Sequence, residues 1–174
     1  AGGLDSNARI GDIVVAKRLY HHDVDASPFK PRYFVPLVGP DGVEADAETS
    51  DALALAAQAF VKDLGKYISV ENMNEFSLSH VKVHRKNIAT GDQFVKTDAV
   101  RGRIMADLPD MYAVEMEGAA VAQVCWEHGL PFAVMRTISD TANGDAPDDY
   151  PKFLARVASI YSFHIVREFL AMGK

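Results

Sequence analysis

Residues 111–139 constrain the fold more than any other stretch, because two apolar runs there flank a helix-like segment of small residues. The first run is MYAVE (111–115), the segment after it is GAAVAQVCWEH (118–128), and the second run is PFAVMRTIS (131–139). Short apolar runs bounded by turn residues predict buried strands, and Gly129 is typical of a helix end. A strand, a helix and a strand in this order predict a layered α/β fold.

The remaining patterns extend this alternation along the chain. Strands are expected over 12–20 and in 66–90, with a polar interruption at ENMNE, and helices over 51–65, 95–109 and 150–172. Thr49 or Ser50 is expected to cap the first of these helices, and Thr97 the second. Pro151 is expected in the first turn of the terminal helix.

Length and charge narrow the class of protein. A chain of 174 residues is expected to form a single domain over 1–174. The net charge of −6 disfavours a nucleic-acid or anionic-membrane surface, since affinity for phosphates requires clustered basic residues. The single Cys125 predicts a buried thiol in a reducing compartment, which fits the cytoplasm. No apolar stretch approaches the roughly 18 residues that a membrane span requires.

A long loop is expected over 21–47. It contains half of the chain's prolines: Pro28, Pro31, Pro36 and Pro40. Loops of this length in compact domains are usually functional.

Polar side chains follow both apolar runs of the 111–139 stretch. Glu115 and Glu117 come at the end of the first run, and Ser139 and Asp140 at the end of the second. Open α/β sheets bind ligands at the carboxyl ends of their strands, so neighbouring strands would bring these side chains into one cleft. The structural alternative is that Glu117 only favours the helix dipole and Asp140 only caps a turn.

The motifs AVEMEGAAVAQVC (113–125) and RTISDTA (136–142) resemble the purine nucleoside phosphorylase and hydrolase superfamily, and within it the bacterial 5′-methylthioadenosine/S-adenosylhomocysteine nucleosidases. The strings AGGLDSNARIGDIVV, HHDVDASPF and GDQF occur in that family's order. The resemblance implies an α/β/α sandwich with a mixed, largely parallel central sheet. It also implies hydrolysis of the N-glycosidic bond of an adenine thionucleoside, without a metal or an organic cofactor.

The resemblance implies two chemical roles. Asp140 corresponds to the acid that protonates N7 of adenine as the bond breaks, because adenine is a poor leaving group as an anion. Ser139 is implied to hold Asp140, with Arg136 near the same polar network. Glu117 corresponds to the carboxylate that accepts hydrogen bonds from the ribose hydroxyls.

Further binding residues follow from the same resemblance. Phe94 corresponds to the aromatic ring that stacks on adenine, and Tyr150 to a lid over the alkylthio group. The sugar and the base edge are implied to contact Ala1, Gly2, Val95, Glu115 and Met116. Phe29 and Pro36 correspond to positions that reach the neighbouring subunit's pocket, which implies a homodimer.

Other interpretations remain open at this point. Relatives begin several dozen residues earlier and carry their water-activating acid there, so these residues are expected to be the C-terminal part of a nucleosidase. A nucleoside phosphorylase would need a phosphate site, for which Arg101, Arg103 and Arg136 are available. A non-catalytic module that binds purine nucleosides is the third possibility. The His21-His22-Asp23 cluster and the pair His80 and His84 lack the ligand spacing of a zinc site.

Overall fold

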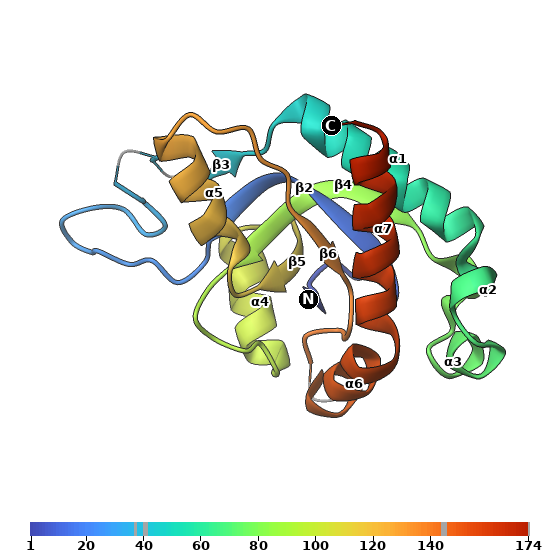
Figure 1. Cartoon of the computed structure of the whole chain (residues 1–174). Coiled ribbons are helices and arrows are strands. Elements are labelled where there is room, and N and C mark those ends of the chain that lie inside the picture. The colour runs from blue at the N-terminus through green and yellow to red at the C-terminus, as the bar shows by residue number, and fades with distance from the viewer. Residues whose placement is uncertain (37, 40–41, 144–145, 174) are drawn as a thin grey trace.

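A mixed sheet of six strands forms the middle of the molecule (Figure 1). The structure is a computed structural model and describes residues 1–36, 38–39, 42–143 and 146–173. The strands in these ranges are β1 (Gly2–Gly3), β2 (Ile13–His21), β3 (Val43–Glu44), β4 (Val83–Thr90), β5 (Met111–Glu115) and β6 (Met135–Thr137).

The three longest strands form the parallel centre of this sheet. β4 lies between β2 and β5 and pairs in parallel with both. The short strands β1, β3 and β6 add antiparallel pairs, β1 to β5 and the other two to different residues of β2. The predicted mixed sheet with a parallel centre is confirmed.

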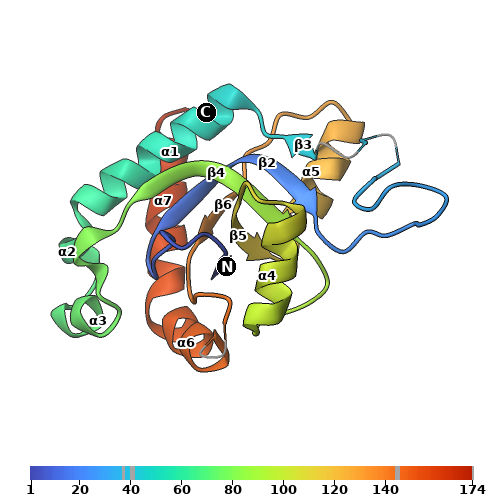
Figure 2. The same ribbon diagram turned by 180° about the vertical axis from the view of Figure 1, so that it is seen from behind.

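Helices cover both faces of the sheet (Figures 1 and 2). Ile13 and Val15 of β2 pack with α1 (Ala47–Lys62) and α7 (Ser159–Ala171), whereas Val14 and Ala16 pack on the side of α5 (Gly118–Glu127). This split follows from the two-residue period of a strand, which sends alternate side chains to opposite faces. Each fully buried Val or Ile contributes roughly 1.5–3 kcal/mol. The predicted α/β/α layering is confirmed.

The strand β1 joins β5 to the segment that follows β6. Gly2 of β1 pairs with Val114 of β5 and also bridges to Asp140, three residues after β6. A Cβ at Gly2 would lie 2.9 Å from the Cβ of Ala142 and 3.0 Å from Oδ1 of Asp140. Only glycine therefore allows the chain to pass between these segments.

Several sequence predictions of local structure are confirmed. The expected strand over 12–20 is β2, and the run 111–115 is β5. The helix α4 (Asp98–Asp107) is capped by Thr97 as expected, since the Thr97 side chain accepts a hydrogen bond from the N–H of Val100. The α5 helix also occupies its predicted range and ends before Gly129, which has a φ of +64°.

The first long helix begins earlier than expected. α1 starts at Ala47 because the carboxylate of Asp46 caps it by accepting the N–H of Thr49 at 2.8 Å. The prediction of Thr49 or Ser50 as the cap is therefore wrong. The helix also ends at Lys62, and Gly65 lies inside the short helix α2 (Leu64–Tyr67).

The prediction of strands throughout 66–90 is correct only for β4. Between α2 and β4 the chain forms α3 (Val70–Glu75), capped by the Ser69 side chain, and the 3₁₀ turn η1 (Leu78–His80). Apolar side chains of this stretch, among them Ile68 and Leu78, pack into the cluster formed with α1 and α7. Tertiary packing thus overrides the strand propensity of the stretch.

The last third of the chain departs from its prediction at two places. Within the expected strand over 131–139, only β6 pairs as a strand. The terminal helix begins at Ala146 and continues through α6 (Ala146–Phe153), the π-helical turn η2 (Leu154–Ala158) and α7. Pro151 therefore lies inside α6 rather than in its first turn. None of the helices in the described ranges has both the length and the apolar character needed to cross a membrane.

The carboxyl end of β2 leads to a buried histidine that makes stability depend on pH. His22 is only 6% exposed, and burial lowers its pKa below the ordinary value of 6.5, against the opposing effect of Asp23. As the pH falls, His22 is therefore protonated in the unfolded chain at a higher pH than in the folded chain. The contribution of neutral, buried His22 to the free energy of unfolding is complete above about pH 6.5 and is lost as the pH falls below it.

We accordingly expect the free energy of unfolding to decrease as the pH falls below about 6.5, and to decrease less in a His22→Gln variant. Urea unfolding at several pH values measures this difference. His128→Gln, which changes an exposed histidine, is the matched control and should keep the full dependence. An unchanged dependence in His22→Gln would show that other groups cause it.

Candidate functional site

A pocket of about 340 Å³ opens where the carboxyl end of β5, the strand β6 and the terminal helices meet. Its walls contain all the predicted site residues except Phe29 and Pro36: Ala1, Gly2, Phe94, Val95, Glu115, Met116, Glu117, Arg136, Ser139, Asp140 and Tyr150. Segments far apart in the sequence thus converge on one cavity.

Asp140 forms a buried wall of this pocket. The residue is only 2% exposed, and both of its carboxylate oxygens accept hydrogen bonds from the chain. The Ser139 hydroxyl donates to Oδ2 at 2.8 Å, and the backbone N–H of Ala142 donates to Oδ1 at 2.9 Å. Ser139 is itself fixed by Ala1, whose carbonyl accepts the Ser139 N–H at 2.9 Å. These contacts hold the carboxyl group in one orientation.

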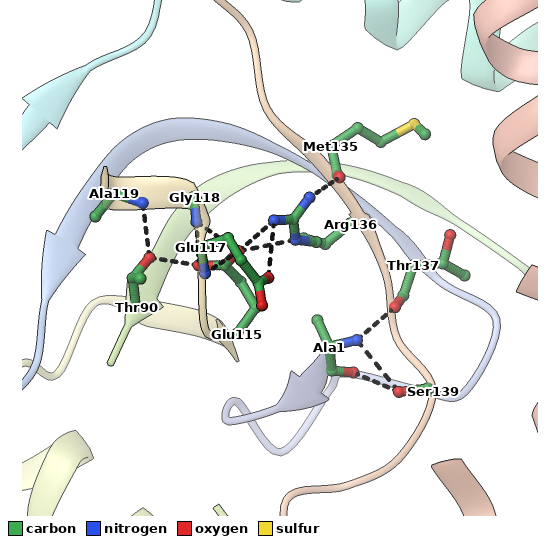
Figure 3. A network of polar contacts seen from close by, with 10 residues as sticks. All are labelled: Ala1, Thr90, Glu115, Glu117, Gly118, Ala119, Met135, Arg136, Thr137 and Ser139. Atoms are coloured by element: carbon green, nitrogen blue, oxygen red, sulfur yellow. Dashed lines mark hydrogen bonds and ion pairs between the residues drawn. The ribbon is translucent and has the colours of Figure 1, made fainter. Parts of the chain in front are cut away.

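Glu115 is the centre of a second polar network (Figure 3). Its carboxylate accepts the N–H of Gly118 at 2.8 Å, the hydroxyl of Thr90, and Nε of Arg136 at 2.9 Å. The Thr90 hydroxyl in turn accepts the N–H of Ala119 at 2.8 Å. Because the N–H of Gly118 donates to Glu115 and the N–H of Ala119 donates to Thr90, these two side chains together satisfy the start of α5. The oxygens of Glu115 are therefore engaged by the protein itself.

Glu117 differs from Glu115 in exposure and in partners. It occupies the N-cap position of α5, yet its side chain makes no capping hydrogen bond. The side chain is 70% exposed, and its nearest charged partner is Nη2 of Arg136 at 3.5 Å. Glu117 thus presents a carboxylate whose acceptor capacity remains available at the pocket.

Two aromatic rings lie at the mouth of the pocket. The rings of Phe94 and Tyr150 meet edge to face, with centroids 5.8 Å apart and an interplanar angle of 63°. Phe94 is 40% exposed, which is high for a phenylalanine and leaves its ring open to a ligand. Met116 is also half-exposed beside the pocket, whereas Val95 is buried and anchors its segment.

The structure changes two expectations about how these residues come together. β5 and the strand before Asp140 are not neighbours, since β1 lies next to β5 and β6 pairs antiparallel with β2. Gly2 instead brings Asp140 toward β5. Arg136, expected near the Ser139–Asp140 network, lines the same pocket but makes its ion pairs with Glu115 and Glu117.

The two residues predicted to reach the pocket of a neighbouring subunit lie outside the pocket of their own chain. Phe29 is 88% exposed on the long loop after β2, which projects away from the sheet in Figure 1, and Pro36 lies on the same loop. Their role in a homodimer stays a prediction. Pro40, part of the same predicted loop, lies outside the described residues.

Sequence reasoning missed the wall formed by the terminal helices. Phe153, Leu154, Ala158 and Ser162 line the pocket from α6, η2 and α7. Leu154, Ala158 and Ser162 recur at intervals of four residues, so they lie on one face of the helix. This periodicity was visible in the sequence but equally consistent with a core-facing stripe. The pocket is completed by Gln93, Val114, Met135 and Thr137.

Metal ligands do not gather in the part of the chain that the structure describes. His, Cys, Asp and Glu side chains form no group of three or more there that could hold a metal ion. His21 and His22 each bury an Nε2 atom without a hydrogen-bond partner in this structure.

A pocket with a fixed buried carboxyl group, an available second carboxylate and an open aromatic ring is suited to a nucleoside: the ring can stack on a base, and the carboxylates can contact a sugar and transfer a proton. Residues 1–171 match the family model of the phosphorylase superfamily, and the chain belongs to that superfamily.

Named relatives confirm the resemblance found in the motifs. A 5′-methylthioadenosine/S-adenosylhomocysteine nucleosidase of Shewanella halifaxensis (strain HAW-EB4) is 38% identical over 158 residues, which cover 90% of this chain and 60% of the relative. The chain thus spans 60% of the length of this curated relative.

Solved structures agree with this assignment. The nucleosidase of the same name from Neisseria meningitidis, in complex with methylthio-immucillin-A, is similar with a TM-score of 0.80 and 30% identity, covering 98% of this chain and 65% of that chain. Futalosine hydrolase of Helicobacter pylori strain 26695 is similar with a TM-score of 0.77 and 31% identity, covering 99% and 65%.

Proposed function

We propose that this chain supplies the nucleoside-binding and proton-donating groups of a hydrolase that releases adenine from 5′-methylthioadenosine or S-adenosylhomocysteine. The observation that carries the proposal is Asp140, a buried carboxyl group fixed by Ser139 and the Ala142 N–H at the wall of a pocket that also contains an exposed Phe94. The relatives named as nucleosidases support the choice of substrate.

The reaction breaks the bond between C1′ of the sugar and N9 of adenine. The bonding electrons move into the purine as Asp140 gives its proton to N7, so adenine leaves as a neutral molecule. The sugar becomes oxocarbenium-like, and the negative charge of Glu117 stabilises it while accepting the ribose hydroxyls. Water then adds to C1′ and gives a proton to the group that activates it. Phe94 orients the base by stacking.

Glu115 acts on this reaction through other residues. Its carboxylate fixes Arg136 and the first N–H groups of α5, and this places Glu117 at the pocket. Glu115 is therefore proposed as a positioning residue. Among the residues that the structure describes, the acidic ones that line the pocket are Glu115, Glu117 and Asp140, each with a role already assigned. We accordingly propose that a further group, none of these three carboxylates, activates the water.

The charges of the pocket favour hydrolysis over phosphorolysis. Arg136 is the arginine that lines the pocket, and Glu115 and Glu117 already pair with it. Arg101 donates two hydrogen bonds to the carbonyl of Leu4. A phosphate co-substrate would compete with carboxylates for the guanidinium at this site.

Adenine release distinguishes the candidate functions. We expect the full gene product to release adenine from 5′-methylthioadenosine at a rate that added phosphate does not change, and residues 1–174 alone to bind adenine but release it negligibly. Chromatographic quantification of adenine, with and without phosphate, is the measurement. Release that requires phosphate would identify a phosphorylase, and adenine binding without release by the full gene product would identify a binding module. Rapid hydrolysis by residues 1–174 alone would show that a carboxylate of this chain activates water.

A further inference from the structure

The segment that carries Phe94 into the pocket is held near its start by a residue that follows the end of another strand. This segment, 91–97, connects β4 to α4. The backbone N–H of Gly91 donates to the carbonyl of Glu115 at 3.2 Å, and the next anchor is the backbone N–H of Asp92. That N–H donates to Oδ2 of Asp23 at 2.6 Å. Asp23 follows the end of β2, and β2 ends on the same side of the sheet as β4 (Figure 1). Its acceptor is a carboxylate, which favours a short hydrogen bond, and the contact lies at the exposed surface.

Close packing joins the same two segments. A Cβ on Gly91 would lie 2.4 Å from Nε2 of His22 and 2.8 Å from Oδ2 of Asp23. The His22 N–H donates to the carbonyl of Thr90 at 2.8 Å, so the backbones are also in register. Even a methyl group at residue 91 would force the turn away from His22 and Asp23. The end of β2 and the start of segment 91–97 are therefore one packed unit.

The exposed ring of Phe94 depends on such anchors. Because Phe94 is 40% exposed, core packing alone does not fix it. Its position follows from the neighbouring residues that are fixed, Asp92 before it and the buried Val95 after it. We call Gln93, Phe94 and Val95 the base wall, since all three line the pocket.

We propose that Asp23 is a positioning residue that holds the base wall in the geometry that binds adenine. This inference rests on the proposed function for the identity of the ligand. Asp23 also lies at the start of the loop that carries the exposed Phe29, so its carboxylate is one of the contacts that join this loop to the base wall.

The test compares Asp23→Ala, Asp23→Asn and a control in the full gene product. Asp25→Ala is the matched control, because Asp25 lies on the same loop but accepts its hydrogen bond from Ser27. Two properties are measured: amide hydrogen exchange of segment 91–97, and the adenine Kd by calorimetry together with kcat and KM for 5′-methylthioadenosine.

For Asp23→Ala we expect faster exchange in segment 91–97, a rise of about tenfold in adenine Kd and in KM, and a smaller change in kcat. Asp23→Asn, which keeps an acceptor oxygen, should restore most of the affinity, and Asp25→Ala should match the parent. Gly91→Ala is a second variant, expected to weaken adenine binding by displacing the same turn.

Each result has a distinct meaning. Unchanged exchange and unchanged adenine Kd in Asp23→Ala would overturn the positioning role. An equal loss of adenine affinity in Asp23→Ala and Asp25→Ala would also overturn the positioning role, since it would reflect a general effect of changing the loop. If the parent neither binds nor releases adenine, the proposed function fails, while faster exchange confined to Asp23→Ala still supports the positioning of the segment.

Discussion

Replacing Asp140 with asparagine is expected to lower kcat for adenine release by about 10³-fold, because general acid catalysis typically contributes 10²- to 10⁴-fold. The fold of the site should survive. The introduced amide oxygen can still accept the Ala142 N–H, and the Ser139 hydroxyl can turn toward the carbonyl of Ala1, which it already contacts at 3.2 Å. What the variant loses is the transferable proton.

Steady-state kinetics measure the expected loss of kcat, and the Kd of a non-hydrolysable substrate analogue measures whether the binding site is preserved. The analogue Kd should change by less than about tenfold, since an amide preserves the shape and polarity of the site. Asp110→Asn, at an exposed position, is the matched control and should behave as the parent. If Asp140→Asn retains kcat within a few-fold, Asp140 is not the acid.

Glu117→Gln is expected to lower mainly the activity and Glu115→Gln mainly the stability, although the two residues are only two positions apart. Glu117→Gln should lower kcat/KM by about 10²-fold through lost stabilisation of the sugar charge. Its melting temperature should stay close to that of the parent, since the side chain is 70% exposed and makes no capping bond.

Glu115→Gln should instead destabilise the fold by about 2–3 kcal/mol. Loss of its charge leaves Arg136 without its main partner and weakens the hydrogen bond to the Gly118 N–H. Chemical denaturation and steady-state kinetics on the same preparations separate the two effects. Strong destabilisation by Glu117→Gln would support the alternative in which Glu117 serves only the helix terminus.

The elements nearest the site were predictable because their signals are local. The apolar run of β5, the small residues of α5 and the Thr97 cap of α4 each encode a period or a hydrogen bond within a few residues. The helices α2 and α3 were not predictable in the same way. Their side chains reach the cluster formed with α1 and α7, and this packing outweighs local propensity.

The sequence by itself determined the residue types of the candidate site, the motifs that place the chain in its superfamily, and the positions of Glu115, Glu117 and Asp140 at or just after the ends of two apolar runs. The tertiary structure alone decided which of these side chains meet. Gly2 pairs with both Val114 and Asp140, and Arg136 forms an ion pair with Glu115. Residues of the terminal helices form the remaining wall of the pocket. Periodicity and caps specify segments, whereas partners are specified by strand pairing and side-chain packing between segments that are distant in the chain.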